Sequence, residues 1–355
     1  MKKALIAMSG GIDSSVAVYL MKQRGFDCTG ATMQLYNGKN NNAHDTDIKD
    51  AKRVAEDMGI PHYVYDFNND FEKEVICRFI DSYEKGDTPN PCIVCNRYIK
   101  WKLLFEKMQE LHLNYVVTGH YARVEFDNKT NKYILKKGLD HSKDQSYVLY
   151  NMTQEQLAHT LLPLGELSKE DARKIAEEQS FHNARKQDSQ DICFIPDGDY
   201  AKFIEEYTGK TYECGNFIDK NGKILGEHKG LIRYTIGQRK GLGLALPKPQ
   251  YVCRKSIEEN TVILGDNEDL FTKRLIATDF NWISGEAPQE PIRIKAKTRY
   301  RHKEQDATAQ VLDSKRVEII FNEPQRAITT GQAVVLYSDD IVVGGGTITE
   351  TESNI

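Results

Sequence analysis

The sequence lacks long apolar runs, and that absence excludes one class of protein. No uninterrupted apolar segment among its 355 residues approaches the roughly 18 positions that a membrane-spanning helix needs. The basic start, MKKALIAMSGG, has only about six apolar positions before the glycines, too few for the apolar region of a secretory signal. We therefore expect a cytoplasmic protein with no membrane partner.

The sequence also contains few cysteines and has no net positive charge. Seven cysteines in a chain of this length are neither dense nor even in number, which argues against a secreted disulfide framework. In a reducing compartment, the thiols of interest are ligands or nucleophiles. The formal net charge of -4 argues against a protein that is basic overall, so any surface for nucleic acid must be a local patch.

Strands and helices are predicted to alternate along the first 120 residues. Apolar runs predict strands, and apolar residues at helical spacing predict helices. The predicted strands span 3–8, 30–36, 62–67 and 114–118, and the predicted helices span 14–23, 47–58, 71–83 and 97–111. This alternation is typical of an α/β protein with a doubly wound parallel sheet, which binds ligands beyond the carboxyl ends of its strands.

The rest of the chain has a different texture. Residues 150–180 are predicted to be helical, with Ser168 as a helix cap and Asp171 three positions later. Short strands and many glycines follow, and then several alternating runs that predict a small β-barrel or sandwich: RLIATDF, IRIKAKTRY, ATAQVLD, RVEIIF, AVVLYSD and IVVGGGTI. We therefore expect three domains, at residues 1–200, 201–272 and 273–355.

A glycine loop follows the first predicted strand. The segment SGGIDSS (9–15) opens a helix, so backbone N–H groups and the positive end of the helix dipole converge there, a geometry that binds phosphate. The loop lacks the lysine of a Walker A motif and the spacing of the dinucleotide-binding GxGxxG. An ordinary glycine turn, with Asp13 or Ser14 as the helix cap, is the alternative interpretation.

Two of the cysteines form a CxxC pair within TPNPCIVCN (88–96). A structural zinc site needs about four ligands, and the sequence contains no second CxxC. A thioredoxin-like pair begins a helix after a strand, which the flanking TPNP does not match. A buried structural pair, a reactive thiol and a set of ligands therefore remain as interpretations.

Further motifs point to one family. SGGIDSS resembles the loop of the ATP pyrophosphatase (PP-loop) superfamily. Four further motifs follow SGGIDSS and TPNPCIVCN along the chain: GHYAR (119–123), KDQSYVL (143–149), KQDSQDICFIP (186–196) and GQRKGLG (237–243). In this order, the motifs resemble the tRNA 2-thiouridylase family, MnmA, over essentially the full length of the chain. The resemblance implies a PP-loop catalytic domain of the adenine nucleotide α hydrolase-like fold at 1–200, a small central tRNA-binding domain at 201–272 and a C-terminal β-barrel at 273–355.

The resemblance also implies a reaction. Members of the family use ATP and Mg²⁺ to adenylate O2 of the wobble uridine, position 34 of the tRNA, and a cysteine persulfide then delivers sulfur while AMP leaves. By the same resemblance, Cys95 is the nucleophile and Cys193 carries the persulfide, with tRNA and a sulfur donor, such as a cysteine desulfurase or a sulfur-relay protein, as partners. Disulfide-bond chemistry is expected to accompany it. A thiolate is the species required, and Arg97, Lys100 and a helix beginning near Asn96 are expected to lower the pKa of Cys95.

The resemblance assigns further residues to the two substrates. The ATP-binding positions are Ala7, Met8, Ser9, Gly10, Gly11, Ile12, Asp13, Ser14, Met33 and Gly119. The tRNA-binding positions are Asn90, Pro91, Cys92, His120, Lys143, Asp144, Gln145, Arg299, Tyr300 and Gln332. Asn90 and the neighbouring prolines are expected to shape the lip that receives the target base, which must leave its stack to be reached.

Cys92 leaves an alternative open. In the family this position is aspartate in some members and cysteine in others. Cys92, Cys95 and Cys193 together would supply the three thiolates that hold a [4Fe–4S] cluster with one iron free. The sequence therefore allows either a persulfide relay, with Cys92 as a spectator, or cluster chemistry.

A basic stripe is predicted in the third domain. Six cations occupy alternate positions, so a strand would place all of them on one face: Arg293, Lys295, Lys297, Arg299, Arg301 and Lys303. A solvated face of a barrel usually mixes both signs of charge, and no acid interrupts this series. We expect the stripe to contact the phosphate backbone of tRNA.

Two rival functions and one departure from the family remain. Many members have a cysteine-containing segment where this chain has NGKNNNAHDTD (37–47). The first rival is a tRNA-binding protein that has lost catalysis, and the intact SGGIDSS loop, Cys95 and Cys193 argue against it. Another PP-loop enzyme is the second rival, either a small-molecule ligase or a 4-thiouridine synthetase, whose RNA-binding domain precedes the loop, whereas this loop begins at Ser9.

Overall fold

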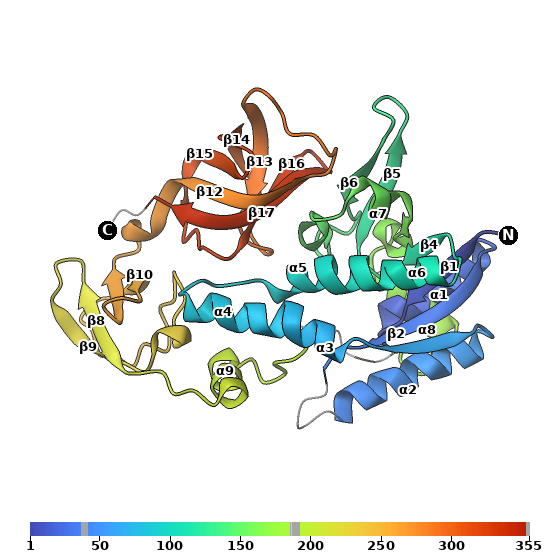
Figure 1. Cartoon of the computed structure of the whole chain (residues 1–355), viewed down its shortest axis with the longest axis horizontal. Coiled ribbons are helices and arrows are strands. Elements are labelled where there is room, and N and C mark those ends of the chain that lie inside the picture. The colour runs from blue at the N-terminus through green and yellow to red at the C-terminus, as the bar shows by residue number, and fades with distance from the viewer. Residues whose placement is uncertain (37–41, 185, 187–191, 353–355) are drawn as a thin grey trace.

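The protein has three parts, which Figure 1 shows as an α/β part, a small central domain and a β-barrel. This is a computed structural model, and it describes residues 1–36, 42–184, 186 and 192–352. The α/β part contains a parallel sheet in the order β3-β2-β1-β4-β7. Its strands are β1 (Lys3–Ala7), β2 (Asp27–Gln34), β3 (His62–Asp66), β4 (Tyr115–Val117) and β7 (Thr160–Leu161).

Helices cover both faces of this sheet because successive strand residues point to opposite sides. Ala4 and Ile6 of β1 share a core with α1 (Ile12–Gln23), α2 (Asn42–Asp57) and α8 (Lys169–Glu178). Leu5 lies in a second core, on the opposite face, with Trp101, Leu104 and Phe105. The doubly wound α/β fold is therefore confirmed.

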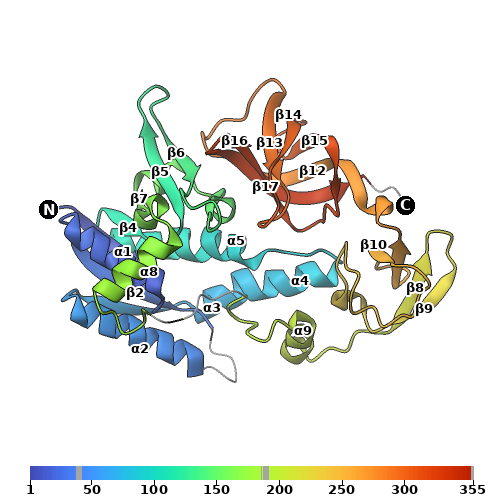
Figure 2. The same cartoon turned by 180° about the vertical axis from the view of Figure 1, so that it is seen from behind.

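A long helix carries the second core and runs from Pro91 to Glu110. Its sections are α5 (Pro91–Cys95), η2 (Asn96–Leu104), which has π-type hydrogen bonding, and α6 (Phe105–Glu110). Figures 1 and 2 both show it lying alongside a second long helix. That helix comprises α3 (Asn68–Phe71), η1 (Glu72–Cys77) and α4 (Arg78–Glu84).

Residues 150–180 are less helical than predicted, because they include the short strand β7. The sequence patterns also did not reveal an antiparallel hairpin that precedes them, β5 (Ala122–Asp127) and β6 (Lys132–Lys137). Three short helices precede α8: η3 (Ser146–Leu149), α7 (Gln154–Ala158) and η4 (Pro163–Glu166). The expected cap of α8 is confirmed, because Ser168 and Asp171 form a reciprocal capping box.

The central domain begins with α9 (Tyr200–Thr208) and contains a four-stranded sheet in the order β10-β11-β8-β9. Phe217, Val252 and Leu264 contribute to its apolar core. Its other elements are β8 (Gly215–Asp219), β9 (Ile224–His228), η5 (Leu231–Arg233), β10 (Tyr251–Ser256), β11 (Thr261–Gly265) and η6 (Glu268–Leu270).

The six alternating runs of the third domain form a closed antiparallel barrel. The barrel closes because β12 pairs with both β15 and β17. Its strands are β12 (Phe271–Trp282), β13 (Ile292–Lys297), β14 (Gln305–Val311), β15 (Arg316–Arg326), β16 (Ala333–Ser338) and β17 (Ile341–Thr351). Strand β6 also pairs with β17, through Ile341 opposite Lys136 and Val342 opposite Leu135. A hairpin from the α/β part therefore extends the sheet of the barrel, as Figure 2 shows from behind.

Candidate active site

The glycine loop lies between β1 and α1, at the carboxyl edge of the parallel sheet. Gly10 has a φ of 70°, and a Cβ at this position would collide with the backbone carbonyl of Asp47. Only glycine fits this left-handed conformation and this close approach. The Ser14 hydroxyl accepts a hydrogen bond from the Ser9 amide at 3.2 Å and donates to the Gly11 carbonyl at 3.0 Å. The loop is therefore pre-shaped before any phosphate arrives.

Asp13 is the charged residue of this loop, and it is held by groups far away in sequence. Lys169 Nζ lies 2.7 Å and 2.8 Å from its two carboxylate oxygens, and the Tyr121 hydroxyl donates to Oδ1 at 2.9 Å. Gly119 packs directly against the same residue, since a Cβ there would come within 2.9 Å of the Asp13 carbonyl carbon. Two of the ATP positions that the resemblance assigns, Asp13 and Gly119, are thus in contact.

Asn183 holds the other side of the loop. Its Nδ2 donates to the Gly10 carbonyl at 3.0 Å and to the Ser15 hydroxyl at 2.9 Å. Lys186 also approaches the Gly10 carbonyl, and its Nζ lies 2.7 Å from a carboxylate oxygen of Asp47. The sequence reasoning missed these loop partners and Lys169, because nothing in their local sequence shows which distant loop they contact.

The helix that carries the cysteine pair begins at Pro91, not near Asn96 as expected. Asn90 is its N-cap and accepts a hydrogen bond from the Cys92 amide through Oδ1 at 3.1 Å. Asparagine at the N-cap and proline at the first helical position are both strong start signals. Cys95 is therefore one turn inside the helix and does not face the free N–H groups at its start.

Three cysteines from two distant segments meet beside this helix. Burial raises the pKa of Cys95 to about 11, while the Lys100 ammonium lowers it and an ionised Cys92 raises it. Burial also raises the pKa of Cys193 to about 12, and the charges that Cys95 and Cys92 carry when ionised raise it further. Cys92 and Cys193 are exposed residues, whereas Cys95 is buried. All seven cysteines are free thiols.

An aromatic cluster anchors the segment that brings Cys193 to this place. The ring of Phe194, which is buried, lies 5.7 Å from that of Phe71, 5.4 Å from Phe79 and 5.2 Å from Phe203, between ring centroids. Cys95 belongs to the same apolar cluster. The residue after Cys193 is therefore fixed in the core that also contains Cys95. The preceding residues of the motif, 187–191, lie outside the described part of the chain.

Only one of the two expected cations faces the thiols. Lys100 lowers the pKa of Cys92, Cys95 and Cys193. The Arg97 guanidinium turns away and pairs with Asp279 of the barrel. The prediction for Arg97 is therefore wrong, because a long-range ion pair holds it elsewhere.

His120 lies between the loop and the thiols and is buried. Its Nδ1 is 2.6 Å from the Thr118 hydroxyl, and its Nε2 is 3.5 Å from Lys100 Nζ. Burial lowers the pKa of His120 well below its usual value, and the Lys100 charge adds to this effect. Both ring nitrogens thus have protein partners. The expected contact of His120 with RNA stays a prediction.

The KDQ segment is built into the protein. The buried Asp144 carboxylate accepts hydrogen bonds from the amide and the hydroxyl of Ser146, at 3.1 Å and 2.9 Å. Gln145 Oε1 accepts a hydrogen bond from the Tyr121 amide at 2.9 Å. Lys143, the third member, is half-buried. These contacts shape the loop, and tRNA binding by the segment stays a prediction.

The barrel touches the lip of the site through Gln332. Its Nε2 donates to the Thr88 carbonyl at 2.7 Å, and the Thr88 amide donates to the Thr330 carbonyl at 3.0 Å. Thr88 precedes Asn90 and Pro91 by two and three residues. The barrel therefore supports the loop that leads into the cysteine helix.

Arg299 and Tyr300 lie on the same side of the barrel as this contact. The Arg299 guanidinium donates to the Thr329 hydroxyl at 2.8 Å and to the Ala327 carbonyl. The ring of Tyr300 lies 5.9 Å from that of Tyr147 in the α/β part. An ionised Cys92 raises the pKa of Tyr300, after the larger effects of burial and Asp144, which places this tyrosine near the thiols.

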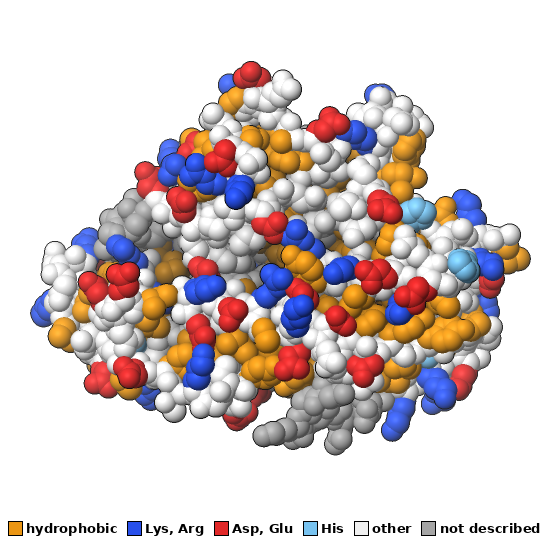
Figure 3. Space-filling model, in the orientation of Figure 1, with side chains coloured by type: hydrophobic (Ala, Val, Ile, Leu, Met, Phe, Trp, Pro, Cys, Tyr) orange, Lys and Arg blue, Asp and Glu red, His pale blue; other side chains and the backbone are white. Residues whose placement is uncertain are grey.

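The predicted stripe of six cations does not form. Strand β13 ends at Lys297, so only Arg293, Lys295 and Lys297 alternate along it, and the chain turns after that point. Lys295 pairs at 3.0 Å with Asp306, its partner on β14. Figure 3 shows basic and acidic side chains interspersed over this face of the molecule. The face therefore carries both signs of charge, because neighbouring strands supply acids that a single strand sequence does not show.

The described residues contain neither a metal-binding group nor a membrane-spanning helix. Among them, no group of three or more His, Cys, Asp or Glu side chains is arranged to hold a metal ion, although all three candidate cluster cysteines are described. The cysteines therefore do not fit the [4Fe–4S] alternative. Within the same part of the chain, no helix is both long and apolar enough to cross a membrane.

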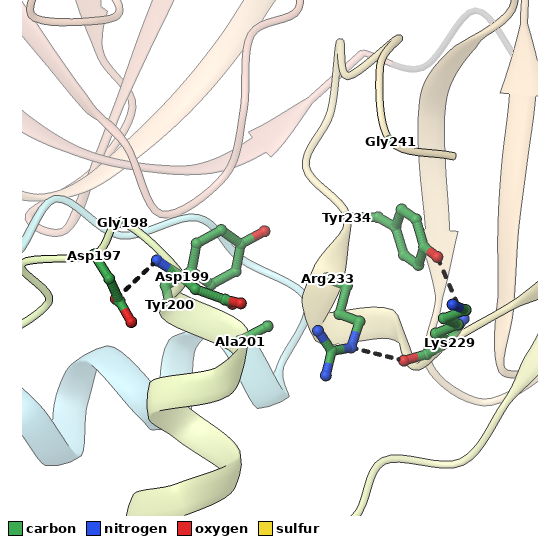
Figure 4. Close-up of a pocket in the computed structure, with 9 residues that line it drawn as sticks. All are labelled: Asp197, Gly198, Asp199, Tyr200, Ala201, Lys229, Arg233, Tyr234 and Gly241. Carbon is green, nitrogen blue, oxygen red and sulfur yellow. Dashed lines mark hydrogen bonds between the residues drawn. The ribbon is translucent and has the colours of Figure 1, made fainter. Parts of the chain in front are cut away.

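A pocket of about 430 Å³ lies away from the thiols, between the start of α9 and the central domain. Figure 4 shows Arg233 beside the Lys229 carbonyl, to which its Nε donates at 3.1 Å. The guanidinium also pairs with Glu205 at 2.7 Å, and Asp197 and Asp199 line the opposite wall. This mixture of charges contains none of the groups that the sequence analysis assigned to ATP or sulfur.

Comparison with known proteins shows the family. Three family models match consecutive parts of the chain: "tRNA methyl transferase HUP domain" at 2–197, "tRNA methyl transferase PRC-barrel domain" at 201–266 and "Aminomethyltransferase beta-barrel domain" at 272–348. The chain is 49% identical over 353 residues to "tRNA-specific 2-thiouridylase MnmA" of Clostridioides difficile, covering 98% of both proteins. It is 48% identical to the protein of the same name from Acetivibrio thermocellus, covering 98% of this chain and 99% of the relative.

A solved structure is more distantly similar. A 4-thiouridine synthetase in complex with RNA and ATP matches 58% of this chain and 50% of its own, with 18% identity and a TM-score of 0.40. That level of similarity carries no conclusion about function. The full-length relatives do show the family: this chain belongs to the tRNA-specific 2-thiouridylases of the MnmA family.

Proposed function

We propose that this protein is an ATP-dependent tRNA 2-thiouridylase that adenylates O2 of the wobble uridine, position 34, and replaces it with sulfur. The observation that carries the proposal is the dipeptide Gly119-His120, which lies between the glycine loop and the three thiols. Gly119 packs against Asp13 of the glycine loop, and His120 contacts Lys100 beside the three thiols. ATP chemistry and sulfur chemistry thus meet at one edge of the sheet, as a thiolation that proceeds through an adenylate requires.

The glycine loop suits the phosphates of ATP. The N–H groups at the start of α1 and the positive end of its dipole favour an anion there. Mg²⁺ would accompany ATP as part of the substrate and neutralise phosphate charge, with Asp13 as the carboxylate at hand. Met33 packs against the core that contains Cys95, so it is placed to separate the nucleotide from the thiols.

The sulfur transfer balances with the two cysteines alone. The terminal sulfur of a Cys193 persulfide attacks C2 of the adenylated uridine, and AMP leaves with the former O2 oxygen. The Cys95 thiolate then attacks Sγ of Cys193. The old S–S bond breaks, its electron pair stays on the sulfur of the new 2-thio group, and a Cys95–Cys193 disulfide forms. A thiol reductant restores both cysteines for the next cycle.

Two partners follow from this chemistry. A tRNA is the substrate, contacted at the lip formed by Asn90 and Pro91 and at the barrel residues Arg299, Tyr300 and Gln332. A cysteine desulfurase or a sulfur-relay protein supplies the sulfane sulfur to Cys193. The seven cysteines, sparse and odd in number, suit a reducing, cytoplasmic setting.

The direct test is mass analysis of nucleosides from unmodified tRNA treated with the protein, ATP, Mg²⁺ and a persulfide donor. We expect 2-thiouridine at position 34, with AMP and pyrophosphate in equal amounts. Cys95→Ala, Cys193→Ala and Asp13→Ala should each abolish it, while Cys214→Ala, an exposed cysteine of the central domain, should not. Sulfur in another nucleoside, or full activity of Cys193→Ala, would overturn the proposal.

A further inference from the structure

We infer that Lys100 is the cation that stabilises the Cys95 thiolate during sulfur transfer, and that His120 is a positioning residue that holds the Lys100 ammonium beside it. The inference deepens the proposed function and rests on it. It assigns Lys100 an electrostatic role in the chemistry and gives the buried His120 a role other than contact with RNA.

The helix geometry selects Lys100. In an α-helix, the residues three and four positions after Cys95, Tyr98 and Ile99, would lie over it. Here Asn96–Leu104 has π-type hydrogen bonds, which link each residue to the one five positions on. This wider turn brings Lys100 one turn above Cys95. Ile99 is fully buried in the same apolar cluster as Cys95 and offers no charge there.

Cys92 lies on the same side of this helix. It precedes Cys95 by three residues in the α-helical section, and residues at that spacing share one helix face. Cys92, Cys95 and Lys100 thus form one row along the helix, and the segment before Phe194 brings Cys193 to it.

His120 fixes where the ammonium lies. Lys100 has only donors, so the Nε2 that faces it at 3.5 Å must be the acceptor, and the proton of the neutral imidazole is on Nδ1. Nδ1–H then donates to the Thr118 hydroxyl at 2.6 Å. The ring also lies 6.3 Å from Trp101, between centroids, and both rings are buried. Thr118 and the core thus hold the imidazole, and the imidazole holds Lys100.

The charges around the thiols make this cation necessary. Burial is the first cause of the raised pKa of Cys92, Cys95 and Cys193, and Lys100 opposes it in all three. Among the described residues, the other titratable groups facing this cluster are the thiols themselves, the neutral His120 and, from the barrel side, Tyr300. Arg97 is paired with the barrel. When Cys95 loses its proton, the nearby Lys100 ammonium balances the new negative charge.

The test measures thiol ionisation directly and needs no tRNA. Intact protein is alkylated with iodoacetamide from pH 6 to pH 11, and peptide mass spectrometry gives the rate at each cysteine. In Lys100→Met we expect the Cys95 rate at pH 8 to fall about tenfold, because an opposite charge nearby lowers an acid pKa by about one unit or more. Lys100→Arg should restore most of the rate. His120→Leu should shift the pH profile in the same direction by less, and His120→Gln, which can accept from Lys100, should restore part of it.

The matched control is Lys102→Met, which removes an exposed lysine from the same helix. Its Cys95 profile should match the wild type, and exposed Cys214 serves as the reference within each sample. An unshifted Cys95 profile in both Lys100→Met and Lys100→Gln would overturn the inference. So would a loss of tRNA affinity in these variants with no change in thiol reactivity, since Lys100 would then be a phosphate contact. Absence of 2-thiouridine from the wild-type reaction overturns the proposed function instead and leaves the thiol measurement valid.

Discussion

The glycine loop and the thiol centre lie at the same edge of the sheet, yet they are built in different ways. The loop is one continuous segment, residues 9–15, whose serines form hydrogen bonds within a few residues, while Asn183 and Lys169 hold it from distant segments. The thiol centre consists of Cys92, Cys95 and Lys100 from the cysteine helix, His120 from the turn after β4 and Cys193 from the segment before α9. The proposed phosphate loop is therefore largely one local motif, whereas the proposed sulfur site exists only through tertiary packing. The two should respond differently to mutation.

The largest effect should come from Gly10→Ala. Its φ of 70° strains any side chain by about 1–2 kcal/mol, and the added Cβ would strike the Asp47 backbone, which cannot move as a side chain can. We expect ATP affinity, measured by calorimetry, to fall at least tenfold, while cysteine alkylation stays unchanged.

The control for that variant is Gly25→Ala, which has a φ of 77° and no atom within 4 Å of the added Cβ. It should lose some thermal stability without losing ATP affinity. If Gly10→Ala bound ATP as the wild type does, the loop would not be the rigid local unit described above.

An intermediate effect is expected for Phe194→Ala, which perturbs the thiol centre and leaves the glycine loop intact. Removing a buried ring typically costs about 3–5 kcal/mol, and here the loss frees the segment that carries Cys193. We expect 2-thiouridine formation to fall tenfold or more with little change in ATP affinity.

Phe79→Ala is the matched control, because it removes a ring of the same cluster but does not adjoin Cys193. It should cost similar thermal stability and less activity. Equal losses of activity in both variants at a temperature where both are folded would show that the cluster stabilises the domain without positioning Cys193 in particular.

The smallest effect should come from Gln332→Ala. It removes a single hydrogen bond from the barrel to the Thr88 carbonyl, worth about 0.5–1.5 kcal/mol. We expect tRNA affinity to weaken a few-fold, measured by filter binding, with ATP affinity unchanged. Gln310→Ala, an exposed glutamine of the barrel, is the control. An unchanged tRNA affinity in Gln332→Ala would show that the barrel does not support the loop at Thr88 for tRNA binding.

Much of the fold could be predicted because hydrophobic periodicity is a local signal. The parallel sheet and all six barrel strands follow it closely. The hairpin β5–β6 escaped, since it pairs with β17, more than 200 residues further along the chain. The basic stripe failed for a related reason: alternation holds only while the strand lasts, and the acid that pairs with Lys295 comes from the next strand.

The sequence by itself determined the candidates for the chemistry: the glycine loop, the two cysteines and their order along the chain. These depend on composition and on neighbours within a few positions. Only the tertiary structure decided which charges face the thiols, sending Arg97 to the barrel and Lys100 to Cys95. The physical reason is that the ionisation of a thiol depends on burial and on charges close in space, and neither distance nor burial can be read from spacing along a chain.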